Sequence, residues 1–288
     1  MSAWSLSLRE GIERDGYVVV PSGLTALQLD GLRSASKKVT KRARDGYWPH
    51  IRTLPRQFPP WPEDPSNGIW GVQQLMNPDL PGSDLFTASY FSKTNLETVK
   101  SLLDCEADDL VMELYNLLVR PDEDFELRWH RDDIPPTATA EEELARLSKP
   151  AYHAQWNLAL YPDSSLILIP GSHRRPLTDV ERAADPYEAN IPGQIHVKLE
   201  AGEMAFYNNN IFHRGAYRSD VERMTLHGSM GHVAGGSLRA RNVLQHGRDW
   251  IDLVDLSRVE DRQTAEGMRD RLVQLASEHE EVGYTHND

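Results

Sequence analysis

Residues 194–207 read Gln-Ile-His-Val-Lys-Leu-Glu-Ala-Gly-Glu-Met-Ala-Phe-Tyr. We expect two short strands here, Gln194–Leu199 and Glu203–Tyr207, with Gly202 at the turn between them. Similar signals recur along the chain, and the further strands expected are a turn-plus-strand at 12–21, Leu110–Arg120, Glu126–His130, His153–Leu160, Leu166–Ile169 and Met224–Met230. Many short strands with turns about every 8 to 12 residues predict a β-sandwich or a β-barrel.

Helices are expected near the two ends of the chain and in one insertion. Capping-box pairs predict three N-termini: Thr25 with Gln28, Thr94 with Glu97, and Thr139 with Glu142. The first helix ends in the basic stretch Lys37–Arg44, and a charged helical tail is expected from about Asp249 to Val282. Residues 45–93 are rich in proline, glycine and tryptophan, and their weak periodicity predicts a long packed loop region.

Composition limits the classes of function. The chain has 288 residues, a formal charge of -13 and one cysteine, Cys105. An acidic surface repels phosphate backbones, so nucleic acid is not an expected partner. The lack of a signal-peptide pattern, of a long apolar run and of paired cysteines favours a cytoplasmic protein without a membrane span. We therefore expect a small-molecule substrate and a monomer or a homodimer.

The motif Trp129-His130-Arg131-Asp132 is a candidate metal site. Residues i and i+2 on a strand share a face, so His130 and Asp132 are expected to point together into a barrel. Two histidines and one carboxylate form the facial triad of non-heme Fe(II) oxygenases, which leaves three positions open on the metal. A lone His-x-Asp is also common as a surface pair, so the motif needs a partner elsewhere in the chain.

His213 is the candidate third ligand. It lies in Ile211-Phe212-His213-Arg214-Gly215, downstream of two expected strands that could return it to the same barrel. The chain holds 11 histidines, so a packed core residue is the alternative interpretation.

Arg223 and Thr225 share one face of the last expected strand. A guanidinium binds a carboxylate bidentately and a nearby hydroxyl adds a donor, which suits the distal carboxylate of 2-oxoglutarate. The alternative is a surface arginine paired with Asp220 or Glu222.

Taken in this order, the motifs resemble those of the phytanoyl-CoA dioxygenase family of Fe(II)/2-oxoglutarate-dependent oxygenases. The stretches that carry the resemblance are Asp15–Val20, Trp129–Asp133, Ile169-Pro170-Gly171-Ser172-His173-Arg174, Leu199–Glu203, His213–Gly215 and Ser219–Arg223. The resemblance spans residues 10–235 and implies a mainly β fold with flanking helices, a double-stranded β-helix of the jelly-roll, cupin-like kind. We expect one domain over residues 1–288, with the barrel core at about 110–232 and the terminal helices packed on it.

The resemblance also implies roles for individual residues. His130, Asp132 and His213 would be the iron ligands, and Arg223 would hold the distal carboxylate of 2-oxoglutarate. The family usually has one more residue between the distal histidine and the arginine, so Arg218 is the alternative anchor.

Two further positions follow from the resemblance. Some relatives have a glutamine three residues before the first ligand, where this chain has Leu127, so Gln155 and Asn157 become the candidates for that co-substrate contact. His173 is not an iron ligand in the family, and a structural hydrogen bond is expected of it.

The implied activity is oxidation of a small organic metabolite, with hydroxylation as the leading outcome and 2-oxoglutarate and O2 converted to succinate and CO2. Halogenating relatives have a small residue where this chain has Asp132, which argues against halogenation. A secondary-metabolite substrate is expected, beneath a lid formed by residues 45–93 and Ile134–Pro150. The rival interpretations are a jelly-roll isomerase or hydrolase using Zn or Mn at the same triad, and a barrel that binds a metabolite without catalysis.

Overall fold

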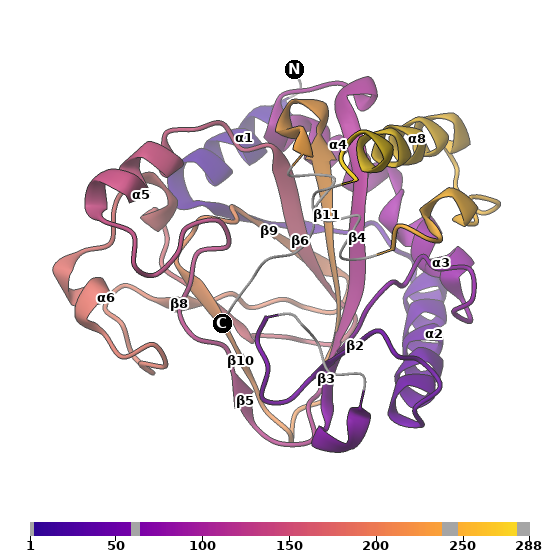
Figure 1. Cartoon of the computed structure of the whole chain (residues 1–288), viewed down its shortest axis with the longest axis horizontal. Coiled ribbons are helices and arrows are strands. Elements are labelled where there is room, and N and C mark those ends of the chain that lie inside the picture. Colours follow the sequence, from indigo (N-terminus) through magenta and orange to yellow (C-terminus); the bar gives the residue numbers. More distant parts are fainter. Residues whose placement is uncertain (1–2, 59–63, 238–246, 281–288) are drawn as a thin grey trace.

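The computed structural model describes residues 3–58, 64–237 and 247–280, and two antiparallel β-sheets form its centre (Figure 1). The larger sheet has seven strands in the order β1-β9-β6-β11-β4-β3-β2, and the smaller has four in the order β5-β10-β7-β8. The strands of the larger sheet are β1 (Tyr17–Pro21), β2 (Ile51–Thr53), β3 (Ile69–Val72), β4 (Leu110–Val119), β6 (His153–Ala159), β9 (Glu203–Tyr207) and β11 (Met224–His232). Those of the smaller sheet are β5 (Phe125–Glu126), β7 (Leu166–Leu168), β8 (Ile195–His196) and β10 (His213–Tyr217).

The order of the strands confirms the expected jelly-roll. From β4 to β11 the chain passes repeatedly between the larger and the smaller sheet, which winds the two sheets into a double-stranded β-helix. Residues 194–207 make one of these crossings, because β8 belongs to the smaller sheet and β9 to the larger. Gly202 has φ +91° just before β9, a left-handed conformation that glycine adopts without strain.

Helices cover the outside of the larger sheet. The helices are α1 (Ala3–Asp15), α2 (Ala26–Arg44), α3 (Ser83–Tyr90), α4 (Lys93–Leu103), α5 (Ala140–Leu147), α6 (Asp179–Ala183) and α8 (Arg262–Glu278). α8 contacts β4, α4 contacts β6 and α2 contacts β3, whereas α5 and α6 lie on the opposite side of the molecule in Figure 1. In the described part of the chain, no helix combines the length and apolar character that crossing a membrane requires.

The two faces of β6 and β11 have different chemistry. In β6, Trp156 and Leu158 pack into the main hydrophobic core on the helix side, while Gln155 and Asn157 line a cavity between the sheets. β11 follows the same alternation, because His227 pairs with Asn157 and Ser229 pairs with Gln155 across the strands. A strand period of two therefore gives the barrel an apolar outer face and a polar inner face.

Several expected elements need correction. Residues 45–93 are not a long loop, because they contain β2, β3 and α3. Every residue of β3 is buried, so the alternation that reveals a half-exposed strand is missing there. The second helix is capped by Ser92 and not by Thr94.

Other boundaries also moved. Residues Ala3–Asp15 form the helix α1, which was not predicted from the sequence. The strand expected at Glu126–His130 ends at Glu126, and His130 pairs with His213 only through an isolated β-bridge. In the tail the α-helix begins at Arg262, and residues 281–282 lie outside the described residues.

Candidate metal centre

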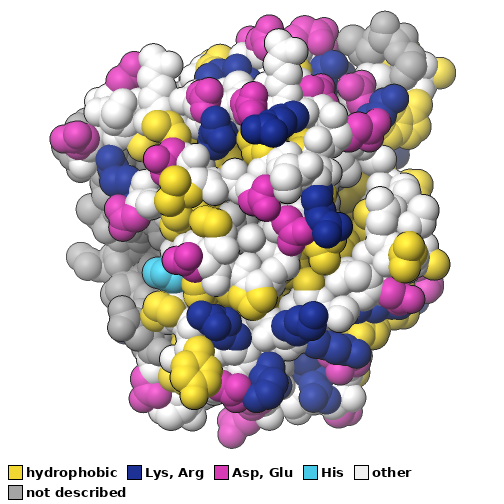
Figure 2. All heavy atoms as spheres, turned by 90° about the vertical axis from the view of Figure 1, so that its right-hand side faces the viewer, with side chains coloured by type: hydrophobic (Ala, Val, Ile, Leu, Met, Phe, Trp, Pro, Cys, Tyr) yellow, Lys and Arg dark blue, Asp and Glu magenta, His cyan; other side chains and the backbone are white. Residues whose placement is uncertain are grey.

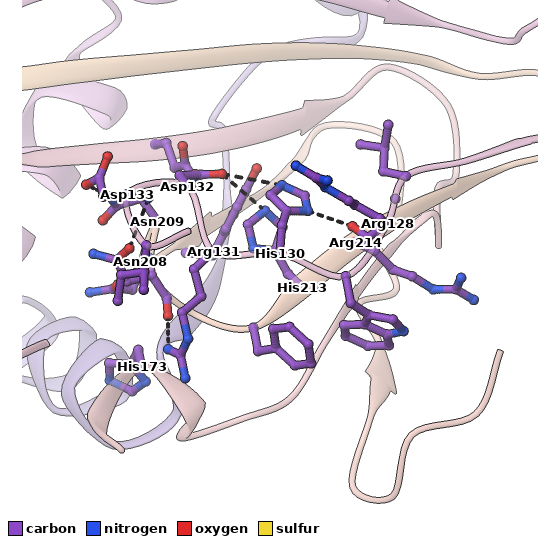
Figure 3. Close-up of a pocket in the computed structure, with 18 of the residues that line it drawn as sticks. Arg128, His130, Arg131, Asp132, Asp133, His173, Asn208, Asn209, His213 and Arg214 are labelled. Carbon is purple, nitrogen blue, oxygen red and sulfur yellow. Dashed lines mark hydrogen bonds and ion pairs between the residues drawn. The ribbon is translucent and has the colours of Figure 1, made fainter. Parts of the chain in front are cut away.

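The three predicted ligands lie together at the inner wall of the barrel. His130, Asp132 and His213 offer ligand atoms that all lie within 4.8 Å of one another. Nε2 of His130 is 3.4 Å, and Nε2 of His213 is 3.8 Å, from Oδ1 of Asp132. The close-up in Figure 3 shows both rings directed toward the carboxylate. This is the ligand set and the spacing that a facial triad requires.

Backbone pairing brings the two ligand segments together. The amide of His130 donates to the carbonyl of His213 (2.9 Å), and the amide of His213 donates back to His130 (3.1 Å). The amide of Asp132 donates to the carbonyl of Asn209 at 2.9 Å. The regular strand that was expected to carry His130 and Asp132 is therefore wrong, but a bridge and a loop still bring both side chains to one centre.

Backbone carbonyls fix the orientation of both imidazole rings on the side that faces away from Asp132. Nδ1 of His130 lies 2.8 Å from the carbonyl of Arg128, and Nδ1 of His213 lies 2.8 Å from the carbonyl of Ile211. A carbonyl accepts only from a protonated Nδ1, so the neutral form of each ring turns an unprotonated Nε2 to the centre of the triad. Metal-binding histidines are commonly oriented in this way.

The electrostatics favour a metal-ready protonation state. Burial and the neighbouring His130 charge lower the pKa of His213 to about 4. Desolvation in the cavity by itself raises the pKa of Asp132, but its contacts with His130 and His213 and the hydrogen bond from Gln155 outweigh it and lower that pKa below its ordinary value. At neutral pH the pair is therefore a neutral imidazole and an ionised carboxylate, which is what a divalent cation binds.

A turn that the sequence analysis singled out for the resemblance supports both ligand segments. Ser172 accepts the amide proton of Phe212 on its Oγ at 2.8 Å, next to His213. The carbonyl of Ser172 accepts from Nη1 of the buried Arg131 at 3.0 Å, between His130 and Asp132. Arg131 was not predicted as a functional residue, and its place inside the motif was the only signal for it.

Arg131 and His173 complete this support. Arg131 also donates to the carbonyls of Asn210 and Arg175, and burial lowers its pKa to about 10, which leaves it charged at neutral pH. Nε2 of His173 lies 3.2 Å from the carbonyl of Glu13, at the end of α1. His173 therefore has the structural role that was expected, away from the triad.

The predicted carboxylate anchor is buried. Arg223 is 5% exposed, so it is not the surface residue of the alternative interpretation. Its Nε donates to Oδ2 of Asp163 at 2.9 Å, and its guanidinium lies over the Tyr217 ring. Nη1 of Arg223 is buried and has no hydrogen-bond partner among the described residues. Arg218, in contrast, pairs with Asp220 at the surface and does not line the cavity.

Thr225 differs from its predicted role. Its hydroxyl donates to Oδ2 of Asp163 at 2.7 Å, so that proton is not available to a bound ligand in this structure. Asp163 thus holds both Arg223 and Thr225. This role of Asp163 was not predicted, because in Tyr161-Pro162-Asp163-Ser164-Ser165 an aspartate is typical of an ordinary turn.

Gln155 and Asn157 have separate positions on β6. Nε2 of Gln155 donates to Oδ2 of Asp132 at 3.0 Å, so Gln155 contacts the triad itself. Oδ1 of Asn157 lies 2.9 Å from Nδ1 of His227. Both side chains line a cavity of about 1010 Å³ that also includes the triad and Arg223.

Both expected lid segments reach this cavity. Gln57, Phe58 and Trp70 line it from the segment 45–93, and Arg146 and Lys149 line it from the segment Ile134–Pro150. Trp129 also lines the cavity, whereas Trp156 and Tyr115 belong to the main hydrophobic core.

Comparison with known proteins supports the fold. The chain matches no protein-family model and no curated protein. Among solved structures it is similar to AviO1 from Streptomyces viridochromogenes Tue57, with TM-score 0.58 and 18% identity over 81% of this chain and 97% of that chain. It is also similar to EctD from S. alaskensis, solved with 2-oxoglutarate and 5-hydroxyectoine, with TM-score 0.59 and 20% identity over 81% and 77%.

A third similar structure is the epimerase SnoN in complex with Fe3+, alpha ketoglutarate and nogalamycin RO. Its TM-score is 0.53, with 16% identity over 80% of this chain and 84% of that chain. At these identities the likeness shows a shared fold, and the class defined by fold and site geometry is a jelly-roll barrel with a two-histidine, one-carboxylate centre.

Proposed function

We propose that this protein is a non-heme Fe(II)- and 2-oxoglutarate-dependent oxygenase of the phytanoyl-CoA dioxygenase type, which hydroxylates a small organic metabolite. The convergence of His130, Asp132 and His213 within 4.8 Å is the observation that carries the proposal. Similar jelly-rolls, EctD and SnoN, were solved with 2-oxoglutarate or alpha ketoglutarate, which supports the same co-substrate here.

The residues of the triad would hold Fe(II) on one face and leave the opposite face to ligands. Bound Fe(II) and 2-oxoglutarate would supply the oxidising chemistry, in which O2 and 2-oxoglutarate yield succinate, CO2 and an oxidised substrate. Gln155 orients the Asp132 carboxylate through its other oxygen. Because Asp132 keeps a carboxylate in the ligand set, we propose hydroxylation and not halogenation.

Arg223 would anchor the distal carboxylate of 2-oxoglutarate. Its unpartnered Nη1 is a buried charged donor, and leaving such a group unsatisfied is unfavourable until a ligand accepts from it. Asp163 fixes the guanidinium through Nε and keeps it from swinging away from the cavity. A jelly-roll isomerase or hydrolase that uses Zn or Mn would not need an arginine to bind the distal carboxylate of 2-oxoglutarate.

The test measures succinate release by the parent protein with Fe(II), 2-oxoglutarate and O2 across a panel of candidate metabolites, together with Fe(II) content. Asp132→Ala should lose both succinate release and metal, while Asp220→Ala should keep both because Asp220 lies in an exposed ion pair. Turnover that needs Zn or Mn and no 2-oxoglutarate would establish the rival enzyme class instead. Retention of Fe(II) and of turnover by Asp132→Ala would contradict the proposed site.

A further inference from the structure

The charge of the cavity is opposite to the charge of the chain. The whole protein has 31 Lys and Arg against 44 Asp and Glu. On the side that carries α2, α3 and α8, acidic side chains are spread among basic ones (Figure 2). The cavity that contains the triad is lined by eight Lys and Arg and only five Asp and Glu. A basic cavity in an acidic protein attracts and holds anions.

Three of these cations are already neutralised by carboxylates. Arg182 pairs with Glu143 at 3.1 Å, Arg214 with Glu126 at 2.9 Å and Arg223 with Asp163 at 2.9 Å. The first pair joins α6 to α5, the other two lie within the barrel, and Arg223 is in addition the proposed anchor of 2-oxoglutarate. These three arginines are therefore set aside, and the remaining cations of the cavity are the candidates for binding an anion.

Arg128 stands out among the remaining cations. Its side chain is half-buried in the cavity wall two residues before His130, and its guanidinium lies 5.2 Å from the centre of the Phe58 ring. No hydrogen bond or ion pair joins that guanidinium to residues 3–58, 64–237 or 247–280. In Figure 3 the Arg128 side chain runs alongside the metal-ligand residues, whereas Arg214 extends away from them.

The position of Arg128 is fixed although its guanidinium pairs with no carboxylate of the described residues. Its amide donates to Oε1 of Gln57 at 2.9 Å, and its carbonyl accepts from His130. The backbone of Arg128 is thus held in place, in part by the contact that orients His130, and the Phe58 ring restricts the guanidinium. A preorganised fork of donors without a carboxylate is suited to bidentate binding of a carboxylate or a phosphate.

Two more cations lie at the lid side of the cavity. Lys149 follows α5, is exposed and has no ion pair within the described residues. Nη1 of Arg146 donates to the carbonyl of Asp133 at 2.9 Å, which leaves its charge without a carboxylate in the part of the chain that the structure describes. These side chains extend the positive potential from the metal centre toward the lid.

We propose that the substrate carries an anionic oxygen group, a carboxylate or a phosphate, which Arg128 binds beside the metal centre with Arg146 and Lys149 supporting it from the lid. This inference deepens the proposed function and rests on it, because it assumes that the substrate is a small metabolite that the protein oxidises. The anion fixes one end of the substrate, and the bond to be oxidised then lies within reach of the position held by His130, Asp132 and His213.

The test uses two fluorescent probes of almost the same shape. Anilinonaphthalene sulfonate carries an anionic oxygen group and N-phenylnaphthylamine does not. Both are titrated against the full-length protein with Mn(II) and saturating 2-oxoglutarate, so that the Arg223 site is occupied. The parent should bind the sulfonate roughly tenfold to hundredfold more tightly than the neutral probe, as expected for one charged hydrogen-bonded contact.

Arg128→Gln should remove most of that preference, because it weakens binding of the sulfonate probe and not of the neutral probe. Arg218→Gln is the matched control, because Arg218 is exposed and outside the cavity, and it should leave both affinities unchanged. Equal affinity of the parent for the two probes would overturn the inference. An equal loss of affinity for both probes in Arg128→Gln would overturn it too.

Competition then names the anion. Naphthoate and naphthyl phosphate should displace the sulfonate from the parent better than naphthol does, and the stronger of the two identifies a carboxylate or a phosphate substrate. Displacement by naphthol as effective as by both anions would contradict an anion site.

Calorimetry of 2-oxoglutarate binding separates this inference from the proposed function. Unchanged 2-oxoglutarate affinity in Arg128→Gln is expected, and a parallel loss would assign Arg128 to the co-substrate and overturn the inference. Absence of 2-oxoglutarate binding by the parent would instead contradict the proposed function, and the probe titrations would still report on the anion site.

Discussion

The metal end and the anchor end of the cavity are built in different ways. His213 begins the strand β10, and an isolated β-bridge joins it to the loop that carries His130 and Asp132. Arg223 instead precedes the regular strand β11 and is positioned by a buried ion pair with Asp163. The metal end depends on backbone pairing between two segments of the chain, whereas the anchor end depends on one buried charge pair. Substitutions should therefore affect metal binding at one end and stability together with co-substrate affinity at the other.

The largest effect is expected at the metal end. Asp132→Ala removes the carboxylate that contacts both histidines, and we expect loss of tight Fe(II) binding and of turnover. Metal content after dialysis and anaerobic calorimetry with Fe(II) measure the loss. Folding should be preserved, because the carboxylate opens onto the cavity with 31% of the side chain exposed. A variant that still binds one Fe(II) per chain would show that the two ends were assigned incorrectly.

Asp163→Ala tests whether the anchor end depends on its ion pair. Both partners are buried, with side chains 6% and 8% exposed, so the variant leaves an uncompensated charge and should lower the free energy of unfolding by about 3–5 kcal/mol. Denaturant titration measures this change. The double variant with Arg223→Met should lose less than the sum of the two single variants, and strict additivity would mean that the pair is not coupled.

The same pair predicts a dependence of stability on pH. Burial by itself raises the pKa of Asp163, but the Arg223 charge and the hydrogen bonds from Ser165 and Thr225 lower it below its ordinary value. The stabilisation is present above the unfolded pKa of about 3.9 and is lost as the pH falls through the lower folded pKa. Parent and Asp163→Ala should therefore converge in stability in acid, and a gap that widens there would contradict the assignment.

Arg223→Gln separates the two ends by affinity. Loss of the buried guanidinium should weaken 2-oxoglutarate by roughly tenfold to hundredfold, the range of a charged hydrogen bond, while Fe(II) affinity stays unchanged. Calorimetry with each ligand gives both values. Arg218→Gln is the matched control, since Arg218 was the alternative anchor and lies at the surface. A 2-oxoglutarate effect in Arg218→Gln but not in Arg223→Gln would reverse the assignment.

The smallest effect is expected at Gln155, which links the strand β6 to Asp132 of the triad. Gln155→Leu removes the hydrogen bond to Asp132 and should weaken Fe(II) binding by about tenfold. This is the low end of the range for residues that orient a metal ligand. Fe(II) titration under anaerobic conditions measures it. An unchanged Fe(II) affinity would indicate that the backbone alone orients Asp132.

The comparison also explains what could be predicted from sequence. The metal end was predictable because His130 and Asp132 are two residues apart and His213 follows a recognisable pair of strands. Asp163 could not be predicted, because its role depends on a contact with Arg223 that only the folded barrel creates. The short, fully buried β3 was missed for a similar reason, since its burial comes from both sides and leaves no alternation in the sequence.

The most direct test of the account is anomalous diffraction at the iron edge from crystals soaked anaerobically with Fe(II) and 2-oxoglutarate. The account predicts one iron peak within bonding distance of His130, Asp132 and His213, and density for 2-oxoglutarate that runs from the iron to Arg223. An iron position away from these three side chains, or a co-substrate whose distal carboxylate does not contact Arg223, would contradict it.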